Sequence, residues 1–242
     1  MKKLYNLLFL LLLLPVFTYA QIDAADTIEK LPATGTAFFV GAGIVSSKVS
    51  YSGNDELNGV GTSGNLSPQI NAGADFYFDK YSKALIFRVA LSYNFGSKAT
   101  LATTYSGDAT NETNLIQSTE VLKFTQSTAS ITPQLIWNFY NSKKLKIYID
   151  AGFGVYADMF SNKNYTVTTH YTTSGTTTTS PRVFPTLHSV VYTVPVEAGI
   201  MLSKNINIYA GYIPKTSLNS DIGYSIGNTR YQAGINYMFN IK

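Results

Sequence analysis

The chain has 242 residues, only 13% of them are charged, and its formal net charge is +4 at pH 7. A soluble domain usually carries about 25% charged residues, and so small and scattered a positive excess argues against a nucleic-acid-binding surface. The absence of cysteine excludes disulfides and a lipid-anchored lipoprotein.

Residues 1–20 have the features of an export signal. Lys2 and Lys3 supply the positive start, an unbroken apolar run covers residues 7–14, and Thr18 and Ala20 place small residues at the cleavage site. The apolar run is short for a transmembrane helix, although an N-terminal membrane anchor is the alternative. We therefore predict three parts: a signal peptide at 1–20, a lead-in at 21–34, and one domain at 35–242.

The remaining chain alternates apolar and polar residues, which is the pattern of β-strands. In residues 85–96 one parity is wholly apolar: Leu85, Phe87, Val89, Leu91, Tyr93 and Phe95. Because successive side chains of a strand point to opposite faces, Arg88 lies on the other face. The same alternation predicts an all-β protein with eight strands, at 36–47, 68–78, 85–96, 131–140, 145–158, 194–202, 206–212 and 230–239.

The connections between these strands alternate in length. Short polar turns are predicted at 79–83, 141–144 and 203–205, and long loops rich in Ser, Thr, Asn and Gly at 48–66, 98–120, 161–186 and 214–228. Short turns at one end and long loops at the other are typical of outer-membrane β-barrels. Further pairing within 48–66 and 98–126 would give ten strands, which remains an alternative.

The charged residues of the strands indicate which face is inside. Every charge near a strand centre shares the parity that also carries the glycines: Asp75, Arg88, Asp150, Glu197 and Arg230. A charge facing lipid at mid-bilayer costs about 2–4 kcal/mol, whereas a narrow bore has room for small residues and a few paired charges. We therefore predict an antiparallel transmembrane barrel with its apolar face toward lipid, and a soluble lipocalin-like barrel is the alternative.

At this point the chain resembles the small outer-membrane barrels of Gram-negative bacteria, the OmpA/OmpX-like porin family. The closing stretch RYQAGINYMFNIK resembles the final strand of that family, which the barrel-assembly machinery reads, although Asn240, Ile241 and Lys242 follow the aromatic Phe239. The resemblance implies a monomer in the cell outer membrane, surrounded by lipid and lipopolysaccharide, with residues 21–34 in the periplasm.

The buried charges are the best candidates for a functional site. If the residue numbers across the turn at 79–83 sum to 163, Asp75 lies opposite Arg88, so we predict an inward contact between them. We expect Asp150 and Glu197 at a comparable height and Arg230 higher. Opposite charges in a narrow bore must pair, because an unpaired buried charge costs several kcal/mol.

Two roles of different class follow for this charge network. In the first, the barrel is a structural anchor with a packed bore, and its extracellular loops, above all 161–186, contact other proteins. The alternation of Tyr165, Val167 and threonine in that stretch could extend the strands at 145–158 and 194–202 as an exposed ribbon with unpaired edges; a mobile solvated loop is the alternative. In the second, the charge pairs gate a narrow pore for ions or small solutes.

Catalysis is a remote third role. Lipid A-modifying enzymes of the resembled family use histidine with serine or aspartate, and this chain offers His170, and His188 beside Ser189. Neighbours on a strand face opposite ways, which is poor geometry for activating a serine. We expect no enzyme, no cofactor, no metal site and no nucleic-acid partner.

Overall fold

The computed structural model describes residues 35–53, 65–77, 85–108, 115–141, 145–171, 174–202, 205–219 and 224–240. Its strands are β1 (Thr36–Gly53), β2 (Asn65–Tyr77), β3 (Leu85–Asp108), β4 (Leu115–Asn141), β5 (Leu145–Gly152), β6 (Gly154–Tyr171), β7 (Thr176–Pro181), β8 (Val190–Thr193), β9 (Val196–Leu202), β10 (Ile206–Ser217) and β11 (Tyr224–Asn240). The predicted signal peptide and lead-in, and nearly all of the three short turns, lie outside the described residues.

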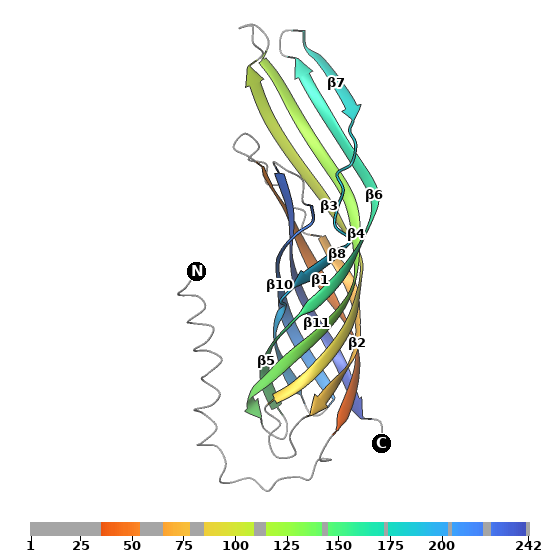
Figure 1. Ribbon diagram of the computed structural model, residues 1–242, viewed down its shortest axis with the longest axis vertical. Helices are drawn as coiled ribbons and strands as arrows, with labels where there is room; N and C mark the ends of the chain where they lie inside the picture. Colours follow the sequence, from red (N-terminus) through yellow and green to blue (C-terminus); the bar gives the residue numbers. More distant parts are fainter. Residues whose placement is uncertain are drawn as a thin grey trace.

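The strands close into a ring of eight (Figure 1). Antiparallel pairing runs from β1 through β2 and β3 to β4, then to a strand formed by β5 and β6, to one formed by β9 and β8, and through β10 and β11 back to β1. A closed ring leaves no strand edge within the barrel, so each backbone amide has a neighbouring strand to bond, as lipid requires. The predicted eight-stranded barrel is confirmed.

Two of the predicted strands are interrupted at the same height. The predicted strand at 145–158 breaks at Phe153, and the predicted strand at 194–202 begins earlier, with β8, and breaks at Val194–Pro195. The register continues across both breaks, because Ala151 pairs with Val196 and Gly154 with Thr193. Proline has no N–H to give to the ladder, so Pro195 removes one bond without shifting the pairing.

The two faces of the barrel differ as the alternation predicts. Large apolar side chains cover the outer wall, with Val40 50%, Leu91 51% and Ile235 56% exposed. The interior, which we call the bore, is lined by buried polar side chains such as Gln69 and Asn236. This is the reverse of a soluble barrel, so the outer wall is a lipid-facing surface.

Above the barrel, four strands continue as one sheet. This corrects the prediction of long loops at 98–120 and 161–186, and within 161–186 it agrees with the alternative of an exposed ribbon. We call it the upper sheet: residues 97–108 of β3, 115–126 of β4, 161–171 of β6, and β7 (Figure 1). The other predicted loops also shrink, because β1 reaches Gly53 and β10 reaches Ser217. Threonine favours strands, so a stretch rich in Ser, Thr, Asn and Gly can form strands, and its composition alone does not indicate a loop.

Bulges separate the barrel from the upper sheet. The register shifts between Asn94 and Ser97 of β3, where Gly96 has a φ of 54°, and on β6 next to Asn162, where φ is 50°. Bulges bend a strand and shift its facing. Above them polarity reverses, since Leu101 points inward and is buried while Thr100 points outward and is exposed. The reversal marks the upper edge of the lipid-facing belt.

Candidate functional site

The lower bore holds a buried ion pair between adjacent strands. Asp75 of β2 lies opposite Arg88 of β3 in the register, and the guanidinium donates to both carboxylate oxygens, from Nε at 2.7 Å and from Nη2 at 2.9 Å. The two residues are 0% and 2% exposed. The guanidinium also lies 4.8 Å from the ring centre of Phe39, a cation–π distance. The predicted Asp75–Arg88 contact is therefore present.

Two carboxylates face each other beside this pair. Asp150 of β5 and Glu197 of β9 are opposite in the register and both are buried. The Gln134 amide nitrogen donates to both, at 3.0 Å to Asp150, and Gln232 donates to the second oxygen of Glu197 at 3.2 Å. Neither acid forms an ion pair within the described part of the chain. Amides therefore replace cations as their neighbours.

A second ion pair spans the bore higher up. Arg230 of β11 donates from Nη2 to both oxygens of Asp158 on β6, each at 2.8 Å, and the Thr128 hydroxyl donates to the same carboxylate at 2.7 Å. Asp158 was not predicted to belong to the charge network. Asp158 has the same parity as Asp150 within 145–158, and this signal could have placed it in the bore. Its pairing with Arg230 could not be predicted from register, because β6 and β11 are not neighbours in the ring.

Tyrosine rings and glycines fill the space between the charges. A Cβ on Gly199 would lie 2.4 Å from the Tyr148 hydroxyl, and one on Gly234 would lie 2.5 Å from the Tyr209 hydroxyl. These glycines therefore leave the room that the rings occupy. The Tyr148 hydroxyl donates to Asn207 at 2.9 Å, which holds the ring across the bore.

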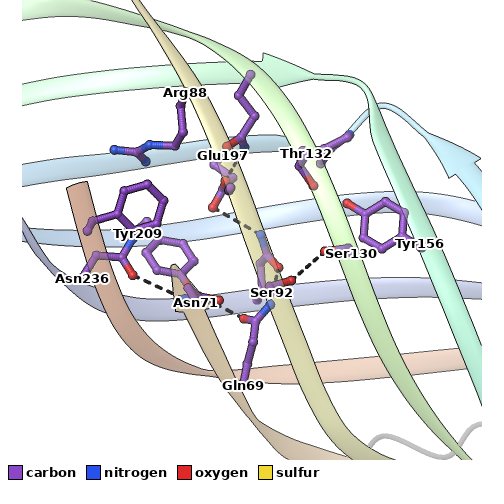
Figure 2. A pocket seen from close by; sticks show the side chains of 15 residues that line it. Gln69, Asn71, Arg88, Ser92, Ser130, Thr132, Tyr156, Glu197, Tyr209 and Asn236 are labelled. Atoms are coloured by element: carbon purple, nitrogen blue, oxygen red, sulfur yellow. Dashed lines mark hydrogen bonds between the residues drawn. The ribbon is translucent and has the colours of Figure 1, made fainter. Parts of the chain in front are cut away.

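Little free space remains among these side chains. Figure 2 shows Arg88, Glu197, Tyr209 and Asn236, from different strands, pointing toward one another around a cavity. Its volume is about 40 Å³, room for a few water molecules, because each needs roughly 10–15 Å³ of such space. Among the lining residues, Gln134 has a buried Oε1 atom without a protein partner, which water in the cavity would supply.

An apolar core lies above the polar part of the bore. We call it the mouth core; its buried members are Val49, Ala99, Leu101, Leu122, Phe124, Tyr156, Val191, Ile213, Leu218 and Ile226. The segment 182–189 packs over it through Phe184 and Leu187, and is fixed by the His188 N–H, which donates to the Leu218 carbonyl at 2.7 Å. Inward apolar residues at this height were not predicted, because every strand was expected to carry its apolar residues on the outer face along its whole length.

Neither histidine side chain is hydrogen-bonded to the buried charges in the described ranges, although the carbonyl of Ser189, next to His188, accepts from the Asp158 N–H at 2.6 Å. His170 is on the upper sheet with its ring nitrogen 3.0 Å from the Thr177 hydroxyl, and His188 is exposed in the covering segment. The Asp158 carboxylate already accepts hydrogen bonds from Arg230 and Thr128. Within the described ranges there is no cluster of three metal-ligating residues, and no helix long and apolar enough to span a membrane.

Comparisons with known proteins give remote similarities of fold. No family model and no curated protein matches the chain. Solved structures that resemble it include Ail of Yersinia pestis, in complex with the heparin analogue sucrose octasulfate (13% identity, 85% of this chain and 99% of that one, TM-score 0.36). Neisserial surface protein A shows 15% identity over 84% and 99% with a TM-score of 0.40. OprG from Pseudomonas aeruginosa shows 12% over 86% and 98%, also with 0.40.

Such low identities and TM-scores carry no argument about activity, and the assignment rests on this chain's own geometry. The ring is closed, its outer wall is apolar and its bore is polar and paired. These are the properties of an outer-membrane barrel. The chain is an eight-stranded β-barrel of the outer-membrane type, located in the outer membrane.

Proposed function

We propose that the protein is a surface anchor with a closed bore. The barrel fixes the chain in the outer membrane, and the upper sheet is the surface presented to the cell exterior. In this proposal lipid and lipopolysaccharide surround the monomeric barrel, and the assembly machinery reads β11. The part of 161–186 that contacts other proteins is β6 and β7.

The observation that carries the proposal is the mouth core. An apolar core directly above a polar bore is a barrier to ions, because a charge that enters it loses its hydration without gaining a partner. Phe124 at its centre makes edge-on contacts with the rings of Phe160 and Phe184, at 5.6 and 6.1 Å. Below the mouth core, Asp75 is paired with Arg88 and Asp158 with Arg230. Because these charges are neutralised within the protein, they offer no binding site to a permeating ion.

The upper sheet supports the contact role. The portion of β6 above its bulge, residues 161–171, spans about 35 Å at roughly 3.3 Å per residue. Cross-strand hydroxyl pairs stiffen the sheet, with Thr104 and Thr119 at 3.1 Å and Thr168 and Thr179 at 3.1 Å. A long, ordered sheet with a polar surface is suited to contact with macromolecules rather than to transport.

Two measurements test the proposal. In planar bilayers the refolded protein is expected to give no steady channel current, with insertion verified by the gel mobility of the folded barrel. Because the chain has no cysteine, single-cysteine variants report exposure. In intact cells an impermeant maleimide is expected to label Thr179→Cys on the upper sheet, while Ser92→Cys in the bore stays unlabelled. Steady current, or rapid labelling of Ser92→Cys, would count against a closed anchor.

A narrow pore is the second candidate. The cavity beside Arg88 and Glu197 favours it, because polar groups of both signs line a space that already admits water. A pore requires that the mouth core move aside. Replacing Phe124 by serine would then raise the current, whereas a closed anchor with this substitution stays silent because the buried charges below remain paired.

A further inference from the structure

The outer edge of β7 is an unpaired strand edge. Along one side β7 is paired with β6: Tyr171 lies opposite Thr176 at one end and Thr166 opposite Pro181 at the other. In the described parts of the chain no strand pairs with its other side. All six of its residues are exposed. Figure 1 shows β7 at the margin of the upper sheet, away from the barrel wall.

Over five of its six residues this edge lacks the usual protections against pairing. Natural edge strands carry charges, prolines or bulges that block a further strand. From Thr176 to Ser180 there is no charge, no proline and no register shift, and Pro181 comes only at the end. An edge of this kind is a template for one more strand.

The sequence of the edge fits a second copy of itself. In an antiparallel pair with Thr178 opposite its own counterpart, Thr177 faces Thr179 and Thr176 faces Ser180. The upper sheet already uses such pairs, because Thr104, Thr119, Thr168 and Thr179 follow one another in register across β3, β4, β6 and β7. Cross-strand threonine pairs are favourable, so a second β7 continues a pattern that is present.

Membrane orientation decides where that second copy sits. Two copies in one membrane point their β7 strands the same way, down toward the barrel. Joining the same edge of two identical strands produces a two-fold, antiparallel pair, which requires the strands to run in opposite directions. Building on the proposed function, we propose that β7 pairs with β7 of a second copy in a facing outer membrane, so that the upper sheet joins two cells or vesicles.

The experiment uses refolded protein in phosphatidylcholine vesicles, prepared as two populations with different dyes. Wild-type populations are expected to cluster with each other and to exclude vesicles without protein. Thr178→Lys places like charges opposite each other in the pair and is expected to reduce clustering at least tenfold. The matched control is Thr166→Lys, which adds the same charge on inner strand β6 and is expected to cluster like wild type.

A second variant keeps the test informative if Thr178→Lys folds poorly. Thr178→Cys is expected to form disulfide-linked dimers between the two populations, because directly opposed residues bring their Cα atoms within about 4.5–5.5 Å; Thr166→Cys forms none. Wild-type vesicles that stay apart, clustering unaffected by Thr178→Lys, or binding only of an added threonine-rich peptide would overturn the inference. Bilayer conductance does not depend on β7, so failure here leaves the closed anchor standing, and a steady current refutes only the anchor.

Discussion

Replacing Arg88 by methionine tests the buried ion pair. The change leaves the Asp75 carboxylate, which is 0% exposed, without the two donors that now lie at 2.7 and 2.9 Å. Breaking one side of a buried pair costs about 3–5 kcal/mol, and methionine retains much of the packing volume of the arginine stem. We therefore expect the free energy of unfolding to fall by about 3–5 kcal/mol.

The assay is urea unfolding in phospholipid vesicles, followed by the fluorescence of Trp137, the single tryptophan. The comparison is with Asp75→Leu and with the double variant, in which no charge remains. Since an apolar replacement of a buried pair is often neutral, the double variant is expected to be more stable than Arg88→Met alone. A loss below about 1 kcal/mol for Arg88→Met, or strictly additive losses, would refute the reasoning.

Three further outcomes are expected. Asp150→Asn removes one of two facing acids and keeps an acceptor for Gln134, so urea unfolding should show a change within about 1 kcal/mol or a gain; a large loss would mean that the carboxylate is required. Gly199→Ala places a Cβ 2.4 Å from the Tyr148 hydroxyl and should destabilise by about 1–3 kcal/mol through overpacking, a loss that disappears if the space can relax. Replacing His170 and His188 together by alanine should leave the lipid A profile unchanged by mass spectrometry, and an altered profile would indicate catalysis.

The fold could be predicted where lipid and bore impose opposite demands on alternate residues. That is why parity predicts the strand at 85–96, and why parity together with a sum of 163 across the turn predicts Asp75 beside Arg88. Adjacent strands joined by a short turn have few possible registers, since a slip of one residue exposes the wrong face. Asp150 and Glu197 also lie opposite each other, but the long stretch between β5 and β9 leaves their register open, so only their comparable height was predicted.

The rest could not be predicted, for identifiable physical reasons. Arg230 and Asp158 meet across the bore from strands that are not neighbours, and no register rule relates such strands. Phe124 and Leu122 belong to the mouth core. Above the membrane the outer face of the sheet meets water instead of lipid, so the apolar residues there lie on the inner face. The threonine-rich ends of β3 and β6 alternate with the opposite polarity, since Ala99, Leu101 and Val167 are buried on the inner face. A rule that places apolar residues on the outer face does not extend to them.

The most direct test of the account compares two adjacent residues, Leu91 and Ser92, each replaced by cysteine and spin-labelled in a phospholipid bilayer. Leu91 is exposed on the outer wall, and Ser92 lines the cavity in the bore. The account predicts that the label at Leu91 collides freely with oxygen dissolved in the lipid, while the label at Ser92 is shielded from it. Equal oxygen accessibility at both positions, or greater accessibility at Ser92, would contradict an apolar outer wall around a closed polar bore.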